Sequence, residues 1–142
     1  MASETTITTA RALIDGLQAH DLSRWADALA DNFTAEYPGA AGLNREQARM
    51  YNQAFLNAFL DLHFDIHRVI ADGDCVAIHW TGSGTHSAAL ATMSGQVIPP
   101  TGRSGVVSGV FVVEVKDGKI VAEHSYWDQI SLLTQLGLMP AS

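Results

Sequence analysis

The chain has 142 residues, and its 15 Asp and Glu against 8 Lys and Arg give a formal net charge of −7 at pH 7. This length predicts a single domain, residues 1–142, large enough to bury a hydrophobic core. The acidic balance argues against nucleic acid or an anionic membrane surface as a partner, and no apolar run is long enough to cross a bilayer.

The single cysteine, Cys75, excludes an internal disulfide and is typical of a protein kept in a reducing compartment. The first residues, "MASETTITTARAL", lack the basic segment followed by an apolar segment that marks a secretory signal. We therefore expect a cytoplasmic protein.

The first part of the chain has the spacing of three helices. One helix is predicted over residues 4–19, and Asp21 is placed to cap a second helix that buries Trp25. Asn44, followed by Gln47, forms a capping-box pattern at the start of the third helix. The inner face of that helix is apolar and aromatic, with Ala48, Tyr51, Phe55, Ala58, Phe59 and Leu62.

Beyond the third helix the apolar spacing changes to a period of two, which predicts strands. They are expected over residues 62–67, 75–86, 105–115 and 120–127, in addition to an extended piece at 32–37. A short last helix is predicted to end at Gly137. Three helices, an antiparallel meander and a short helix indicate an α+β domain with helices on one face of the sheet.

The turn "KDGK" sets which side chains of the last two strands meet. A three-residue loop after Val115–Lys116 pairs Phe111 with Ser125 and Val113 with Glu123. One face of these strands then carries Val107, Gly109, Phe111, Val113, Glu123, Ser125 and Trp127.

Four segments, "ADGDCVAIHWTGSGTH", "PPTGR", "DGKI" and "YWDQISLLTQLG", occur in the order and at the spacing of one family. In these segments the chain resembles the SnoaL-like polyketide cyclases, within the fold of nuclear transport factor 2 and ketosteroid isomerase. The resemblance extends over nearly the whole chain. It implies a cone-shaped, curved antiparallel sheet whose pocket is closed by the helices. It also implies cofactor-free proton abstraction from an activated carbon, followed by ring closure or isomerisation.

The residues at that family's catalytic positions differ here. By alignment with the family, Ser125 stands where the polyketide cyclases carry a catalytic aspartate, and Phe111 where they carry a histidine. Tyr37 stands where ketosteroid isomerases carry their general base. The resemblance therefore implies Tyr37 and Ser125 as site positions, but not the family's usual aldol cyclisation.

Glu123 is the only carboxylate predicted on the pocket face of the last two strands. Walled by Phe111 and Trp127, it would have its pKa raised by desolvation and would act as a general acid or base. The alternative is that Glu123, near the turn, reaches solvent at the rim. Asp128 directly precedes "QISLL", where an N-cap is favoured over a catalytic role.

Aromatic residues are expected to line the pocket and bind substrate, namely Trp25, Tyr51, Phe55, Phe59, Trp80, Phe111 and Trp127. Tyr37 and Tyr51 could donate hydrogen bonds to a carbonyl or enolate, or have their hydroxyls satisfied at the pocket edge. His67 and His79 are predicted to lie opposite each other, where a polar outer face is favoured over a metal site, because no third ligand has a recognised spacing.

Together these features predict a cofactor-independent cyclase or isomerase of secondary metabolism, acting on a hydrophobic, polyketide- or terpenoid-like small molecule. One alternative is a non-catalytic ligand-binding protein of the same fold. Another is an epoxide hydrolase, which would need an Asp–Arg–Asp set that Arg68 and Arg103 are poorly placed to complete. A homodimer is also expected, because Val106, Val110 and Val112 leave the outer sheet face apolar.

Overall fold

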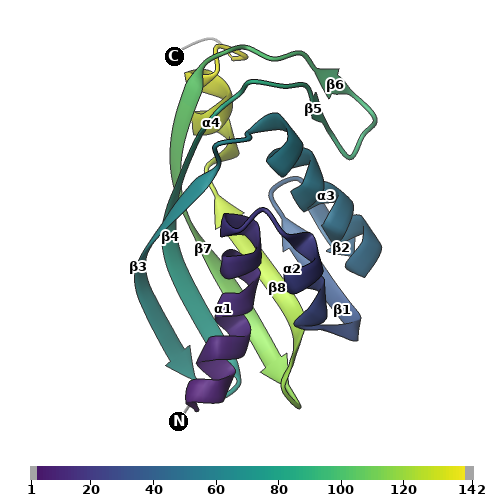
Figure 1. Cartoon of the computed structure of the whole chain (residues 1–142), viewed down its shortest axis with the longest axis vertical. Coiled ribbons are helices and arrows are strands. Elements are labelled where there is room, and N and C mark those ends of the chain that lie inside the picture. Colours follow the sequence, from purple (N-terminus) through teal and green to yellow (C-terminus); the bar gives the residue numbers. More distant parts are fainter. Residues whose placement is uncertain (1–2, 140–142) are drawn as a thin grey trace.

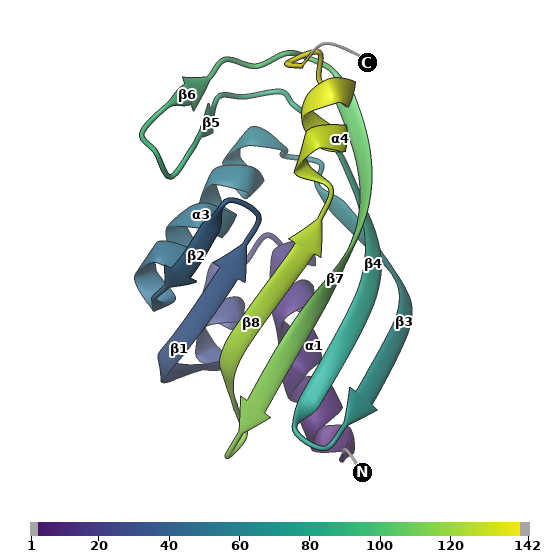
Figure 2. The ribbon, with the colours of Figure 1, turned by 180° about the vertical axis from the view of Figure 1, so that it is seen from behind.

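A computed structural model describes residues 3–139 of the chain (Figures 1 and 2). Within these residues the helices are α1 (Glu4–Gln18), α2 (Leu22–Asp27), α3 (Arg45–Ala58) and α4 (Gln129–Gln135). The strands are β1 (Leu29–Tyr37), β2 (Ala40–Leu43), β3 (His63–Asp72), β4 (Cys75–Thr85), β5 (Leu90–Ala91), β6 (Val97–Ile98), β7 (Ser104–Lys116) and β8 (Lys119–Trp127). The predicted α+β class is confirmed.

Helices α2 and α3 begin at the residues whose side chains were expected to cap them. Asp21 accepts hydrogen bonds from the backbone N–H groups of Ser23 and Arg24, at 3.0 and 3.4 Å. The Asn44 side chain accepts from the Gln47 backbone at 2.9 Å, and the Gln47 side chain accepts from the Asn44 backbone at 3.0 Å. These bonds satisfy N–H groups that have no partner within the first helical turn.

The strands of the larger sheet follow the order β2-β1-β8-β7-β4-β3. Helices α1, α2 and α3 lie over its concave face, whereas the sheet forms the surface of the opposite side (Figures 1 and 2). Neighbouring strands are antiparallel except β1 and β8, which run parallel and place Ala35 beside Glu123. The sequence predicted the antiparallel strands, but not this parallel pair, nor the short strands β2, β5 and β6.

The predicted register between β7 and β8 is confirmed. Phe111 pairs with Ser125 and Val113 with Glu123, and a bulge beside Val115 accommodates the turn. Because paired residues point to the same side of a sheet, Phe111, Glu123 and Ser125 all face the helices. All three are buried.

The predicted register between β3 and β4 is wrong by one residue from Arg68 to the turn. The turn between them holds two residues rather than three, so Arg68 pairs with His79. A bulge at His67 then shifts the register by one residue, and Ile66 pairs with Trp80 as expected. The rings of His67 and His79 still lie 5.2 Å apart on the outer face.

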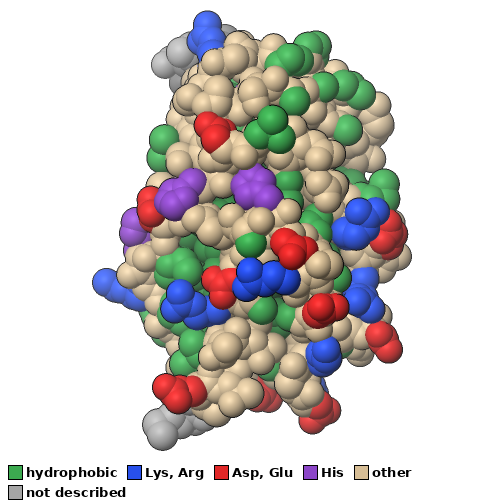
Figure 3. All heavy atoms as spheres, viewed as in Figure 1, with side chains coloured by type: hydrophobic (Ala, Val, Ile, Leu, Met, Phe, Trp, Pro, Cys, Tyr) green, Lys and Arg blue, Asp and Glu red, His purple; other side chains and the backbone are tan. Residues whose placement is uncertain are grey.

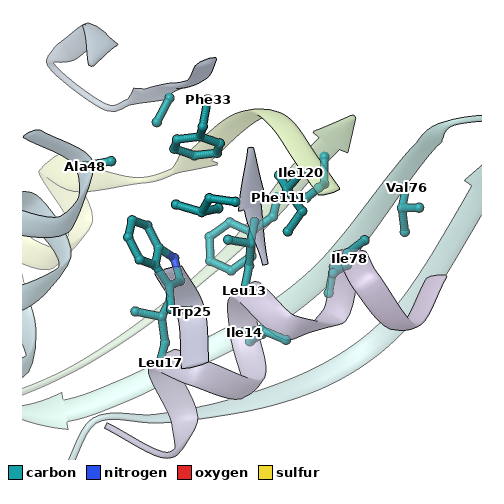
Figure 4. Packing of buried hydrophobic residues seen from close by; sticks show 14 of the residues in the cluster. Leu13, Ile14, Leu17, Trp25, Phe33, Ala48, Val76, Ile78, Phe111 and Ile120 are labelled. Carbon is teal, nitrogen blue, oxygen red and sulfur yellow. The ribbon is translucent and has the colours of Figure 1, made fainter. Parts of the chain in front are cut away.

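The hydrophobic core fills the space between α1, α2 and the sheet, and Trp25 lies within it (Figure 4). The Trp25 ring meets Phe33 edge-on, with centroids 6.2 Å apart. Gly16 permits this packing, because a Cβ atom at that position would lie 2.8 Å from the Cβ of Trp25. The same buried cluster also includes Tyr37, Trp80 and Phe111.

None of the helices between residues 3 and 139 has the length and apolar character needed to span a bilayer. On the outer sheet face, Val106 is exposed and Val110 and Val112 are half-buried. This face is the one on which the sequence predicts a homodimer contact.

Candidate active site

A cavity of about 90 Å³ lies between α3 and the concave face of the sheet. Its aromatic lining consists of Tyr37, Tyr51, Phe55, Phe59, Phe64, Trp80, Phe111 and Trp127. Its polar lining residues are Asn52, Ser83 and Ser125 together with the two tyrosines, and no charged residue lines it. The structure thus places a cavity among the residues for which the sequence predicted one, and such a lining suits a neutral, mostly apolar ligand.

The aromatic rings form a continuous wall along one side of the cavity. Tyr37 and Tyr51 stack with centroids 4.2 Å apart, and Tyr51 continues to Phe55 at 5.2 Å. Phe55 meets Trp127 edge-on at 5.8 Å. Because these contacts join α3 to the ends of β1 and β8, the wall is held by three separate elements.

Trp25 was expected in this lining, but the structure places it elsewhere. Its side chain is 1% exposed and packs in the core against Phe33. The helical spacing predicted correctly that Trp25 points inward. It could not show that α2 lies over the core and not over the cavity.

A chain of hydrogen bonds lies at the inner end of the cavity. The Tyr37 hydroxyl donates to Glu123 Oε1 at 2.8 Å. Asn52 Nδ2 donates to the Tyr37 hydroxyl at 2.9 Å and to the Ala48 carbonyl at 2.8 Å. Since Ala48 O can only accept, the amide nitrogen of Asn52 must face it, and the Tyr37 oxygen therefore accepts from Asn52. The only Tyr37 proton is then left for Glu123 or for a ligand.

The parallel pairing of β1 with β8 brings these hydrogen-bonded residues together. Ala35 lies beside Glu123, and Tyr37 follows two residues later on the same face of β1. Asn52 reaches Tyr37 from α3, four residues after Ala48. The site therefore depends on contacts between distant parts of the sequence.

Burial governs the protonation of both Tyr37 and Glu123. It raises the pKa of Glu123 to about 7, although the hydrogen bond from Tyr37 acts in the opposite direction. Burial, together with the nearby Glu123 carboxylate, raises the pKa of Tyr37 well above its ordinary value of 10.0. Near neutral pH Tyr37 therefore stays a phenol, whereas Glu123 can gain or lose a proton.

The sequence left open whether Glu123 is buried on the pocket face or reaches solvent at the rim. The structure shows that it is buried. The side chain is 2% exposed, so it does not reach solvent at the rim. It also does not form part of the cavity wall, where Tyr37, Asn52 and Ser125 lie instead. Glu123 therefore contacts the cavity through Tyr37, one layer behind the surface that a ligand would touch.

Two further residues that carry polar atoms line this space. Ser125 lines the cavity and is 2% exposed. Trp80 also lines it, and its buried Nε1 has no hydrogen-bond partner among the described residues. Gly109 leaves room for the indole, since a Cβ there would lie 2.6 Å from Trp80 Cζ2. An unpartnered buried N–H favours a ligand that carries an acceptor oxygen.

Sequence reasoning missed Asn52, which supplies the only amide in the lining. A signal was present, because Asn52 is a polar residue between Tyr51 and Phe55 on the predicted inner face of the third helix, four residues after Ala48. Polar residues at such positions need a buried partner. Here the partners are Tyr37 and a backbone carbonyl.

Asp128 caps α4, as the sequence favoured. Its Oδ1 accepts from the Ser131 backbone N–H at 2.9 Å, and Asp128 does not line the cavity. On the outer face, His67 Nε2 lies 2.6 Å from Thr81 Oγ1. Between residues 3 and 139 no group of three or more His, Cys, Asp or Glu side chains is arranged to hold a metal ion.

The sequence model of the family described as SnoaL-like domain matches residues 10–123. No match is found among curated protein sequences. Among solved structures, a candidate SnoaL-like polyketide cyclase from Jannaschia sp. CCS1 superposes with a TM-score of 0.83 at 19% identity, covering 99% of each chain.

Two more solved structures share the fold. Wild-type IdmH, a candidate polyketide cyclase from Streptomyces antibioticus, has a TM-score of 0.76 at 24% identity, over 93% of this chain and 98% of its own. An LEH-like epoxide hydrolase from M. tuberculosis has a TM-score of 0.65 at 23% identity, over 93% of this chain and 89% of its own. At these identities the likeness shows the cone-shaped fold alone.

Proposed function

The chain belongs to the SnoaL-like domain family, and we propose that it is a cofactor-independent cyclase or isomerase that moves a proton on a neutral, hydrophobic carbonyl compound. The observation that carries this proposal is the buried hydrogen bond between Tyr37 and Glu123 at the wall of an uncharged cavity. The pKa of Glu123, about 7, matches the value at which a general acid–base group works best near neutral pH.

Tyr37 is the group that would touch the substrate, and Glu123 would store the proton behind it. With Glu123 ionised, a proton leaves the carbon next to the substrate carbonyl for the Tyr37 oxygen, while the phenolic proton passes to Glu123. If the resulting enolate is conjugated with a carbon–carbon double bond, it regains the proton at another carbon by the reverse transfer. Alternatively it attacks a second carbonyl carbon of the same molecule, and the alkoxide so formed takes the proton back from Glu123 through Tyr37. The first outcome is an isomerisation and the second a ring closure, and neither needs an oxidant or a cofactor.

Other residues of the cavity support the same chemistry. The Nε1–H of Trp80 has no partner among the described residues, and it would donate to the substrate oxygen, where negative charge develops in the enolate. The aromatic wall excludes water and folds a flexible substrate so that its reacting carbons meet. Asn52 keeps the Tyr37 oxygen in place and directs its proton away from α3.

An α-proton exchange assay tests this proposal without knowledge of the natural substrate. The protein is mixed with a bicyclic ketone such as 2-tetralone in D2O, and loss of the α-proton signal is followed by NMR. We expect exchange above the buffer rate in the wild type and a loss of this increase in Tyr37→Phe. If the ketone binds, as shown by quenching of tryptophan fluorescence, but exchanges only at the buffer rate, the non-catalytic binding protein is the correct alternative.

The hydrolase alternative has less support. Water activation of the epoxide hydrolase type needs carboxylates and an arginine inside the cone, and no charged residue lines the cavity. Arg68 and Arg103 are both exposed. Turnover of a hydrophobic epoxide by the wild type would reverse this ranking.

We also propose that the protein forms a homodimer through the outer face of the sheet. Val106, Val110 and Val112 form an apolar strip there, and burial against a second copy would remove it from water. Light scattering at micromolar concentration tests the dimer. A monomeric mass at that concentration would contradict it.

A further inference from the structure

A second hollow lies beside the cavity and shares a wall with it. It has a volume of about 280 Å³ and lies between α4, the turn joining β1 to β2, and the β5–β6 hairpin. We call it the outer groove. Four side chains border both spaces, namely Tyr51, Phe55, Trp127 and Leu132. The outer groove therefore lies next to the proposed site, and these side chains form the wall between the two.

The outer groove is uncharged and largely apolar. Its apolar lining includes Leu90, Met93, Ile98, Leu133 and Leu136, and its polar lining residues are Thr92, Ser94, Gln96 and Gln129. No Asp, Glu, Lys or Arg occurs within residues 87–102 or 129–139, although the chain carries 23 such residues, 8 basic and 15 acidic. The surface over the β5–β6 hairpin in Figure 3 likewise shows hydrophobic and uncharged side chains, whereas charged side chains gather farther down over the helices.

The hairpin that forms one wall of the outer groove is fixed at its base. The Ser87 and Ala88 N–H groups both donate to the Ala58 carbonyl at the end of α3, at 3.1 and 3.3 Å. The tip closes on itself, since the Thr92 N–H donates to the Gln96 carbonyl at 2.8 Å. Met93, at this tip, is 43% exposed although it borders the groove. An exposed apolar residue at a groove mouth favours an apolar ligand beneath it.

The volumes of the cavity and the outer groove indicate how large a ligand each can hold. The cavity, about 90 Å³, has room for the reacting part of a small molecule, whereas the outer groove, about 280 Å³, is roughly three times larger. A polyketide-like chain or fused-ring compound that placed its carbonyl beside Tyr37 would have to extend past Phe55 and Trp127.

We propose that the outer groove is a second binding subsite, which holds the uncharged, extended remainder of the same substrate whose carbonyl end occupies the cavity. This inference rests on the proposed function for the position of the reacting end. It narrows the substrate to an elongated, neutral carbonyl compound with an apolar tail. Met93 would then determine specificity for chain length without taking part in the reaction.

A series of phenyl alkyl ketones from acetophenone to decanophenone tests the subsite. Their dissociation constants are measured by quenching of tryptophan fluorescence, because Trp127 lies between the two spaces. In the wild type each added methylene should tighten binding by roughly fourfold until the chain passes the groove mouth. Met93→Asp should weaken the longest ketone by roughly tenfold or more and leave acetophenone unchanged, because it places a charge only beside the distal part of the chain.

Val97→Asp is the matched control. Val97 lies on the same hairpin and is 59% exposed, but it does not border the groove. We expect the whole series to bind this variant as it binds the wild type. Equal effects of the two substitutions, or a wild-type affinity that stops rising after the first methylenes, would overturn the subsite.

A ketone of the same length that ends in a carboxylate tests the predicted neutrality. It should bind more weakly than its neutral counterpart, because no cation borders the outer groove, and equal binding would contradict the substrate class. The exchange of acetophenone separates this inference from the proposed reaction. If acetophenone exchanges only at the buffer rate, but Met93→Asp and Val97→Asp differ in their affinity for the longest ketone, the proposed reaction is wrong and the subsite is supported. If acetophenone exchange depends on Tyr37, but the two variants bind the longest ketone equally, the reaction is supported and the subsite is wrong.

Discussion

Strands β1 and β8 carry two pairs of the same chemical groups, one on each face of the sheet. Inside, Tyr37 of β1 donates to Glu123 of β8 at 2.8 Å. Outside, Tyr126 of β8 donates to Glu36 of β1 at 3.4 Å, and His124 lies 3.2 Å from the same Glu36 oxygen. The inner pair is 4% and 2% exposed, whereas Tyr126 is 53% exposed.

Both pairs consist of a tyrosine and a glutamate, so burial of the inner pair, and not its residue types, would make it reactive. Desolvation raises the pKa of Glu123 to about 7 and that of Tyr37 well above its ordinary value. The outer pair is in contact with water, which screens its charges and competes for its hydrogen bonds. Each member of the outer pair is therefore a matched control for the corresponding inner residue.

The largest expected effect comes from removing the inner hydroxyl. Tyr37→Phe should lower the rate of α-proton exchange by about 10²- to 10⁴-fold, because it removes the group that touches the substrate and leaves the ring in place. Tyr126→Phe should leave the rate within a few-fold of the wild type. NMR exchange rates for both variants check the prediction, and equal losses would show that the two tyrosines do not differ in function.

The next effect comes from removing the inner carboxylate. Glu123→Gln should lower the exchange rate by roughly 10²-fold or more, since an amide accepts the Tyr37 hydrogen bond but takes up no proton. Glu36→Gln should have little effect. If the inner pair acts as a unit, the double variant with Tyr37→Phe should be only slightly slower than the slower single variant. Multiplied losses would instead indicate two independent roles.

Much of this comparison could be predicted from local sequence, but its key contact could not. The turn after Lys116 and the period of two along β7 and β8 predicted that Glu123 and Ser125 share one face with Phe111, and the family resemblance indicated that this face is the inner one. Helix caps at Asp21 and Asn44 were predicted for the same reason, because each depends on residues only two or three positions away.

The contact between Tyr37 and Glu123 spans 86 positions in the sequence, and it depends on the parallel pairing of β1 with β8. No local pattern encodes such a pairing. The resemblance to the family marked Tyr37 as a site position, and strand spacing marked Glu123, but nothing linked them. For the same reason Trp25 was expected in the cavity, because helical spacing shows that a residue points inward but not which interior space it meets.

The third prediction concerns stability. The pKa of Glu123 is raised from 4.5 to about 7 on folding, so the native state holds this proton more tightly than the unfolded state does. Between these two pH values the native state binds more protons, and its free energy of unfolding therefore falls as pH rises. By about pH 8 the loss is nearly complete and amounts to about 3 kcal/mol, because each pKa unit corresponds to about 1.4 kcal/mol.

Glu123→Gln should remove this pH dependence. Urea unfolding at pH 8 should show the variant to be more stable than the wild type by about 3 kcal/mol, with the difference disappearing below pH 4.5. Glu36→Gln is the control, because Glu36 lies on the outer face at the same level of the sheet. A wild-type stability that does not fall between pH 4.5 and pH 7 would show that Glu123 is not desolvated as the structure indicates.

The smallest effect concerns a third carboxylate, that of Asp128, which directly follows β8. We expect Asp128 to contribute to stability but not to the reaction. Asp128 accepts from the Ser131 N–H and begins α4, so Asp128→Ala should lower the free energy of unfolding by about 1 kcal/mol. Asp128→Asn should restore most of this loss, since Asn is also a good N-cap, and the exchange rate should be unchanged in both variants. Removing the carboxylate of Asp128 thus destabilises the protein without touching the reaction, whereas removing that of Glu123 stabilises it above pH 7 and stops proton transfer. A drop in exchange for Asp128→Asn as large as that for Glu123→Gln would mean that the reactive carboxylate lies at the start of α4 and not behind Tyr37.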